Sequence, residues 1–441
     1  MATDFTQLII CLLAGVTVIV ILTAKYHIHA FFALLIACFI VGIGAQMPVA
    51  NIIDNVKDGF GNIMRSLGLI IVLGTALGII LEHTGSTKVM ASFILKLVGE
   101  KNAALAMSIT GFIVGMPIFC DSGFIVLNGI NKSVAKRAGI SVAITGVSLA
   151  TALLSIHCLI PPHPGAASAA SLVGVDFGKL ILAGIVVALP AMIVGNRWAN
   201  YAGKKMKFVA AEEAIIASAI SKPPSVINAF LPVIIPIILI TLKSFLTIET
   251  SAAGWLKIFS IVGDPVIALA IGVLLAFNCS RSWTKNSVSK QLQESAEKAG
   301  SILVIIGAGG AFGAVLAATK IGEQFSAILP LNTLGILFPF LLTFMLKTAQ
   351  GSSTVAIITA ASIIQPLLAA LGLQTDTGKL LCVLSMGAGS MMISHANDAY
   401  FWVIAKFSGL DMKTMLKVYS IATLWMGLAA LLMVYLLSLI L

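Results

Sequence analysis

A carboxylate stands at the end of an apolar run in the segment GMPIFCDSGF, residues 115–124. Ionisable groups inside a membrane segment are costly and usually functional, so Asp121 is a candidate for carrying a proton. We expect Gly123 to allow a tight turn that exposes backbone N–H groups and a helix N-terminus, which can hold an anion. Ser122 and Gly123 are therefore assigned to substrate binding, and Asp121 would be protonated when the anion binds. The alternative is a helix cap formed by Asp121 or Ser122.

A second polar interruption lies at residues 350–354, in the sequence QGSST. Gly351 gives flexible backbone, and Ser352, Ser353 and Thr354 offer three hydroxyl groups that could bind the hydroxyls of a substrate. Packing of small residues between helices is the alternative interpretation. The functional interpretation gains weight because this segment occupies the matching place in an internal sequence repeat.

Three prolines in four positions interrupt a third apolar segment, PPHPGAASAAS, residues 161–171. Three prolines so close together cannot continue a helix, and the small residues that follow could start a new half-helix whose N-terminus faces the break. We therefore expect His163, which lies between two of the prolines, to bind substrate. A solvated histidine in an extracellular loop is the alternative. We interpret His157, on the apolar stretch before the break, as a core histidine.

The fourth interruption is SHANDAYFW, residues 394–402, directly after the apolar stretch MGAGSMMI. Clusters of His and Asp in membrane segments recur in proton relays. We assign Ser394 and Asn397 to substrate binding, and His395 and Asp398 to proton coupling. The end of a helix that reaches cytoplasmic water is the alternative.

The remaining motifs do not indicate an enzyme, a cofactor or a metal site. Six scattered cysteines form no CxxC pair, and the histidines lack the spacing of metal ligands. GAGGAFG, residues 307–313, lies inside an apolar stretch, where close helix packing is the better interpretation than a nucleotide loop. The sequence also lacks a GxxxxGK[ST] motif, an HExxH motif and a convincing pair of nucleophile and base.

The elements that position these residues must be membrane helices. The mean hydropathy is +1.07, and 10% of the residues are charged, against about 25% in a soluble domain. Apolar stretches of membrane-spanning length therefore predict a polytopic α-helical membrane protein. The clearest stretches are 8–24, 30–45, 66–81, 138–156, 180–195, 226–248, 301–318 and 417–441.

The net charge of +10 comes mainly from basic segments that we expect to be cytoplasmic loops. These segments are residues 131–137, 196–225 and 279–299. The positive-inside rule explains them, so nucleic acid is not an expected partner.

Three pairs of segments resemble one another, in the same order and at nearly one spacing. They are 74–81 with 309–316, 120–127 with 350–357, and 173–180 with 408–415, at offsets of 235, 230 and 235 residues. If 102–131 and roughly 332–370 are re-entrant hairpins, the basic segments place the two repeats in opposite orientations, with both termini outside. Inverted repeats with interrupted helices are typical of secondary transporters. We divide the chain into N-terminal spans (1–50), a first repeat (51–195), a linking region with two spans between two basic loops (196–299), and a second repeat (300–441).

The chain resembles the gluconate:proton symporter (GntP) family, part of the ion transporter superfamily, over most of its length. The motifs that carry the resemblance are LIPPHPGA (159–166), GDPV (263–266), GSSTVAIITA (351–360) and SHANDAYFW (394–402). The resemblance implies symport of a sugar acid or related hydroxy acid with protons across the inner membrane. It also implies a scaffold domain and a transport domain with two opposed hairpins, which moves as an elevator. By the same analogy, we expect a homodimer in the lipid bilayer.

Two departures from the family pattern leave the substrate open. Gluconate carriers of the family often have Tyr-Glu-Val-Gly where this chain has residues 120–123, CDSG, and Pro-Gly where it has Ala399 and Tyr400. The substrate is thus gluconate or a shorter or different acid, such as glycerate, a threonate-like acid or D-serine. A sodium-coupled symporter, and an anion exchanger or channel for small carboxylates, are the competing functions.

Overall fold

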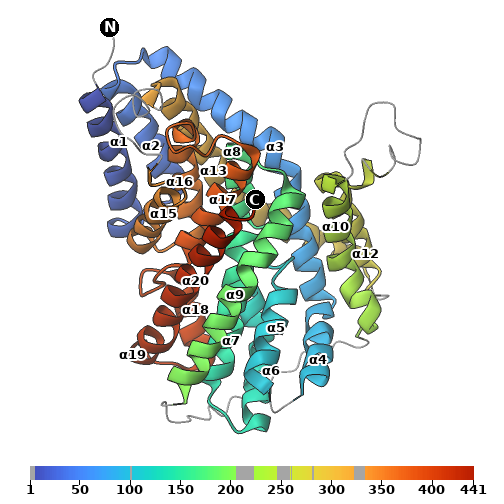
Figure 1. Ribbon diagram of the computed structural model, residues 1–441. Helices are drawn as coiled ribbons and strands as arrows, with labels where there is room; N and C mark the ends of the chain where they lie inside the picture. Colours follow the sequence, from blue (N-terminus) through green and yellow to red (C-terminus); the bar gives the residue numbers. More distant parts are fainter. Residues whose placement is uncertain are drawn as a thin grey trace.

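The protein is all-helical in the part of the chain that the computed structural model describes, which comprises residues 5–99, 102–204, 223–245, 259, 261–280, 283–321 and 333–441 (Figure 1). Within these ranges, seven helical segments are long and apolar enough to cross a membrane, which confirms the expected polytopic α-helical class. They are Thr6–Thr23, Val49–His83, Val142–Val173, Phe177–Gly203, Val226–Ser244, Lys285–Ala318 and Met412–Ser438.

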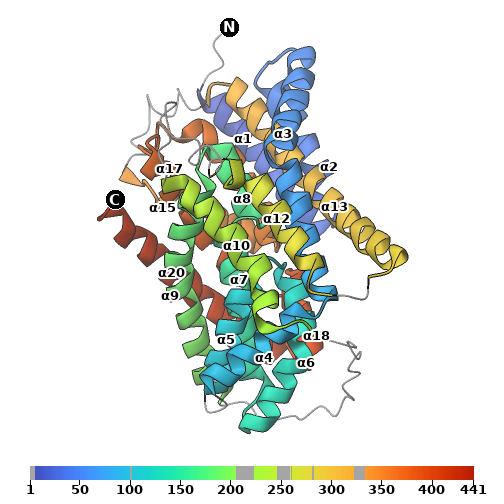
Figure 2. The same ribbon diagram turned by 90° about the vertical axis from the view of Figure 1, so that its right-hand side faces the viewer.

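Two long helices, α3 (Val49–His83) and α13 (Lys285–Ala318), run alongside each other through the molecule (Figures 1 and 2). They approach closely because glycines meet at the contact: a Cβ added to Gly310 would lie 2.6 Å from the carbonyl oxygen of Gly59. This geometry confirms that the glycine-rich segment 307–313 serves close helix packing. The N-terminal helices α1 (Phe5–Val20) and α2 (Ala30–Gly44) pack against each other, and α2 also packs against α13 and α3.

Four helical elements are broken in the middle. The first is α5 (Ala103–Val114) with α6 (Cys120–Ala138), the second α7 (Val142–Leu159) with α8 (Pro164–Val173), the third α15 (Leu337–Gln350) with α16 (Ser353–Ile364), and the fourth α17 (Asp376–Met391) with α18 (Ala399–Ser408). Each break falls in one of the segments that contain proline, glycine or clustered polar residues. Non-helical backbone at membrane depth is tolerated where protein or a water-filled cavity surrounds it.

Local chemistry accounts for the breaks. Gly351 ends α15 in the left-handed conformation, with φ +82°, which residues other than glycine rarely adopt. The hydroxyl of Ser352 then accepts the N–H of Val355 and starts α16. In the same way, the carboxylate of Asp398 accepts the N–H of Tyr400 and starts α18.

The turn before Asp121 is not where we expected it. The break covers residues 115–119, and Gly123 lies in the first turn of α6 with ordinary helical backbone. The prediction that Gly123 makes the turn is therefore wrong. Its small size serves packing instead, because a Cβ added there would lie 3.0 Å from a methyl carbon of Leu153. Pro117, inside the break, is the residue that cannot continue α5.

Two of the predicted basic loops are helical. Residues 131–137 belong to α6, and from Lys285 onward the segment 279–299 is the first part of α13. The hydroxyl of Thr284 accepts the N–H of Ser287 and caps this helix, so the basic residues extend a membrane helix beyond its apolar part. Of the third basic segment, 196–225, residues 205–222 lie outside the described residues.

The other helices cover the broken elements. They are α4 (Ser86–Val98), α9 (Phe177–Gly203), α10 (Val226–Phe245), α12 (Pro265–Phe277), α19 (Met412–Met415) and α20 (Ile421–Ser438), with short 3₁₀ and π turns at Gln365–Leu367, Ile21–Lys25 and Leu416–Ser420. Helices α9 and α20 pack together, and α10 and α12 form a pair at the edge of the molecule (Figures 1 and 2). This covering leaves α7 buried along its whole length from Ala143 to Leu159.

One pair of repeated segments has the same local structure. Gly174 and Gly409 each end a helix in the left-handed conformation, with φ +81° and +65°. Two residues later, Asp176 accepts the N–H of Lys179 at 2.9 Å, and Asp411 accepts the N–H of Thr414 at 3.0 Å. Each aspartate thereby starts the next helix, so the sequence match corresponds to one repeated cap-and-restart motif.

Candidate functional site

A cavity of about 430 Å³ lies where the four breaks meet one face of α13. Its size is within the range of pockets that hold small molecules. The residues that line it come from α6 (Cys120, Asp121, Ser122, with Phe119 before them), α7 (Leu154, His157), α8 (Pro164), α13 (Lys298, Ser301, Ile302, Ile305), the α15–α16 break (350–355) and the start of α18 (397–400).

Four helix N-termini reach this cavity. The helices α6, α8, α16 and α18 all contribute residues of their first turn or their N-cap to its wall, and each is ten residues or longer. The unpaired N–H groups and the dipole at a helix N-terminus favour negative charge. The cavity is therefore electrostatically suited to an anion.

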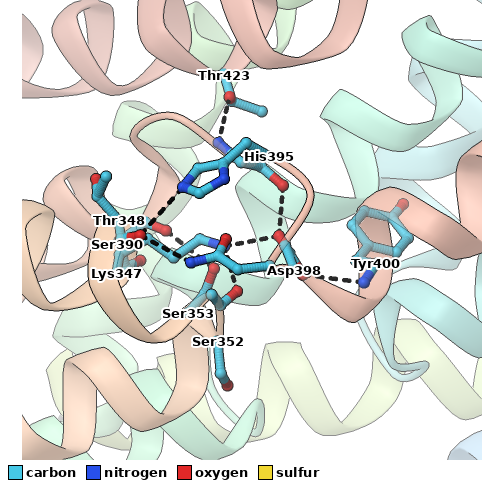
Figure 3. A network of polar contacts seen from close by, with 12 residues as sticks. Lys347, Thr348, Ser352, Ser353, Ser390, His395, Asp398, Tyr400 and Thr423 are labelled. Atoms are coloured by element: carbon cyan, nitrogen blue, oxygen red, sulfur yellow. Dashed lines mark hydrogen bonds and ion pairs between the residues drawn. The ribbon is translucent and has the colours of Figure 1, made fainter. Parts of the chain in front are cut away.

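A buried ion pair holds two of the walls together (Figure 3). The ammonium of Lys347 lies 2.6 Å from the carboxylate of Asp398 and donates to the carbonyl of Gly351 at 2.5 Å. The lysine is 1% exposed. Ser394 donates a further hydrogen bond to the same carboxylate, and the N–H of Tyr400 donates at 2.9 Å. These contacts tie the tip between α15 and α16 to the start of α18.

Sequence reasoning missed Lys347. The signal that could have found it is a charged residue on an apolar helix, one turn before the break at 350–354. Burying a lysine there without a partner is too costly, so its presence predicts an ion pair with one of the membrane carboxylates.

Four of the predicted site residues do not line the cavity. Ser394 is fully buried, and besides its bond to Asp398 its N–H donates to Thr423. A ring nitrogen of His395 lies 3.1 Å from the carbonyl of Thr348, in the last turn of α15. Gly123, in α6, packs against Leu153 of α7. A ring nitrogen of His163 lies 2.8 Å from the carbonyl oxygen of Gly115, in the α5–α6 break. Asn397 does line the cavity, and its amide N–H₂ caps α15 by donating to the carbonyls of residues 348 and 349.

His157 is buried, as expected of a core histidine, but it also lines the cavity. Its Nε2 lies 3.1 Å from the hydroxyl oxygen of Thr354, and both residues line the cavity. His163 lies behind it, with the ring centroids 4.9 Å apart, and its Nε2 pairs with the carbonyl of Gly115 at 2.8 Å. The helix α7 is apolar on every face because other helices surround it, so its sequence gave no sign of which residue faces the cavity.

The α15–α16 break offers further polar groups. Ser352 caps α16, and Ser353 donates to the carbonyl of Ser390 at 2.9 Å, so these two hydroxyls are partly used within the protein. Gln350 differs: it lines the cavity, it is 9% exposed, and both polar atoms of its amide lack a partner among the described residues. Buried polar groups are rarely left unpaired, so this amide stands out as unsatisfied among the described residues.

Two charged side chains face the cavity without forming an ion pair within the described residues. The carboxylate of Asp121 accepts a hydrogen bond from the thiol of Cys120 at 3.0 Å. The ammonium of Lys298, on α13, donates to the hydroxyl of Ser122 at 3.0 Å. Sequence reasoning missed Lys298 because it assigned the basic residues of this segment to a loop. In the described part of the chain, His, Cys, Asp and Glu form no group of three or more suited to a metal ion.

Helices broken at mid-length, with their ends gathered around one cavity among membrane-spanning helices, are characteristic of transporters. Two solved transporter structures have this fold. The Alcanivorax borkumensis YdaH transporter matches with a TM-score of 0.65 at 15% identity, over 89% of each chain. Neisseria gonorrhoeae MtrF matches with a TM-score of 0.60 at 16% identity, over 88% of this chain and 83% of its own. At such low identity, the likeness concerns the fold alone.

The family is evident from the sequence comparisons. Residues 7–440 match the model of the GntP family permeases. An uncharacterized permease of Haemophilus influenzae is 35% identical over 94% of this chain and 89% of its own. A gluconate permease of Pseudomonas aeruginosa is 31% identical over 97% of both chains, and the Escherichia coli D-serine transporter DsdX is 30% identical over 97% of this chain and 98% of its own. The chain belongs to the GntP permease family and is a multi-pass membrane permease rather than an enzyme, which confirms the resemblance and the class.

Proposed function

We propose that the protein is a proton-coupled symporter that imports a small hydroxy acid or a related carboxylate across the inner membrane. The observation that carries the proposal is the carboxylate of Asp121, which forms no ion pair within the described residues and lies in a cavity that four helix N-termini make attractive to anions. Relatives named for gluconate and for D-serine support small polar carboxylates as the substrate class.

Asp121, rather than Asp398, carries the coupled proton. Protonation of Asp398 would leave the ammonium of Lys347 buried without a counter-charge, which is strongly unfavourable. Protonation of Asp121 breaks no ion pair within the described residues. A neutral Asp121 also stops repelling the substrate carboxylate, so proton and anion bind with positive coupling.

Charge counting defines the driving force. One proton carried with one monovalent anion moves no net charge, so only the pH gradient drives uptake, at about 1.4 kcal/mol per pH unit. The membrane potential, worth about 2.3 kcal/mol per charge per 100 mV, then does no work. A second proton would make the transport electrogenic.

The transport cycle follows from the arrangement of elements. We infer that residues 51–195 and 300–441 are inverted repeats, each with one hairpin and one interrupted helix. The shared cap-and-restart motif at Asp176 and Asp411 supports this repeat. The hairpins and interrupted helices move as one body against a scaffold that includes α3 and α13, in an elevator motion, and a homodimer holds the scaffold in the membrane.

A second candidate function rests on the pair of free charges in the cavity. The carboxylate of Asp121 and the ammonium of Lys298 line the same space, and neither forms an ion pair within the described residues. A zwitterion such as D-serine presents the complementary pair. Such a substrate could bind Asp121 through its amino group and would then need no proton on that residue.

Uptake by purified protein in proteoliposomes tests the proposal. The panel contains labelled gluconate, glycerate, threonate and D-serine, each with and without an inward proton gradient, and with sodium replaced by potassium at fixed pH. Concentrative uptake of one hydroxy acid, driven by the pH gradient alone, supports proton symport. Uptake that needs sodium, or that only equilibrates under every condition, contradicts it in favour of sodium coupling or of a channel. Preference for D-serine supports the zwitterion instead.

A further inference from the structure

We propose that Lys298 binds the substrate carboxylate and thereby selects acids over uncharged polyols. The residue comes from α13, outside the four broken elements that supply the rest of the site. This inference rests on the proposed function in one respect, that the substrate carries a carboxylate.

The position of Lys298 on α13 is the first support. Lys298, Ser301, Ile302 and Ile305 all line the cavity, at the spacing i, i+3, i+4 and i+7 that puts residues on one face of a helix. Lys298 is the first of the four, where the polar start of α13 gives way to its apolar stretch. The side chain is half-buried at the cavity, whereas Lys285 and Lys290, earlier on the same helix, are exposed and do not line it.

The hydrogen bonds of Lys298 leave it free to bind an anion. An ammonium group has three N–H donors, and here one of them bonds to the neutral hydroxyl of Ser122. Glu82, on α3, interacts electrostatically with Lys298 but forms no ion pair with it. Lys347 contrasts with this arrangement, because Asp398 and the carbonyl of Gly351 already hold its ammonium.

The surroundings favour a carboxylate at this place. Ser122, the partner of Lys298, lies in the first turn of α6, so an anion there gains from the ammonium and from the helix N-terminus together. Gln350, whose buried amide lacks a hydrogen-bond partner among the described residues, also lines the cavity. Asp121 lines the same cavity as Ser122 and Lys298, so a charge on Asp121 acts on an anion bound there.

Equilibrium binding to purified protein in detergent tests the inference without any gradient. Each hydroxy acid of the panel is paired with the polyol that has an alcohol in place of the carboxylate: sorbitol for gluconate, glycerol for glycerate and threitol for threonate. The variants are Lys298→Met and Lys298→Arg. Lys290→Met is the matched control, because it removes an exposed lysine from the same helix. Size-exclusion profiles and Tm confirm that each variant is folded.

We expect Lys298→Met to weaken the binding of the preferred acid by about tenfold or more, because one charge-assisted hydrogen bond is lost. The affinity for the paired polyol should stay unchanged. Lys298→Arg should retain most of the preference for the acid, and Lys290→Met all of it. Unchanged acid binding by Lys298→Met, or an equal loss for acid and polyol, overturns the inference and leaves the proposed function intact. If the wild-type protein binds none of the acids, the proposed function itself fails.

Discussion

Either charge of the Lys347–Asp398 pair should destabilise the protein when it is left buried without its partner, and Lys347→Met tests this. Removing one partner of a buried pair costs about 3–5 kcal/mol, because the other charge stays buried. Here the carboxylate would keep two donors, the hydroxyl of Ser394 and the N–H of Tyr400, and hydrogen bonds to a charged group are worth about 1.5–3 kcal/mol each. We therefore expect a loss at the lower end of the range, about 3 kcal/mol.

The double variant Lys347→Met with Asp398→Asn removes both charges. Replacement of a whole buried pair is often neutral, so its stability should return to within about 1 kcal/mol of the wild type. The assay is Tm of the purified protein in detergent, with uptake measured in the same preparations. Lys406→Met, which removes an exposed lysine of α18, is the matched control. A single variant as stable as the wild type, or a double variant as unstable as the single one, would refute the reasoning.

Two further substitutions probe the walls of the cavity. Gly351→Ala should lower Tm by clearly more than Gly409→Ala. Both glycines have the left-handed backbone conformation, which costs a residue with a side chain about 1–2 kcal/mol. Only at Gly351 would the added Cβ also collide, because it would lie 2.1 Å from the carbonyl oxygen of Asn397. Equal shifts in Tm would show that this tip can relax. Thr354→Val keeps the side chain's shape and removes the partner of His157, which should cost about 1 kcal/mol and raise KM for uptake. An unchanged KM would remove this pair from the site.

The helix breaks could be predicted from the sequence because their signals are local. Prolines at 161, 162 and 164 disfavour continuation of the preceding helix, and glycine followed by serines at 351–353 favours a helix end and a new helix start through its own backbone and capping chemistry. The position of a turn is less well determined, and the first break lies before Asp121 rather than at Gly123 because Pro117 interrupts the helix earlier.

The partners of the charged residues could not be predicted in the same way. Lys347 and Asp398 are far apart in the sequence, and their contact depends on how two broken elements pack. Lys298 looked like an ordinary basic residue near a membrane surface, because the positive-inside rule explains such residues without a site. His157 looked like a core residue because α7 is apolar on all sides, and only the packed structure shows which side faces the cavity.

If Asp121 carries the coupled proton, the proton flux that accompanies substrate entry must depend on this residue. Wild-type protein and Asp121→Asn are reconstituted in proteoliposomes that contain a pH-sensitive dye, and the preferred acid of the panel is added outside. The account predicts that substrate entry acidifies the lumen of wild-type vesicles, and that Asp121→Asn shows no such signal while it still exchanges labelled for unlabelled substrate. Substrate entry into wild-type vesicles without acidification, or acidification that Asp121→Asn leaves unchanged, would contradict it.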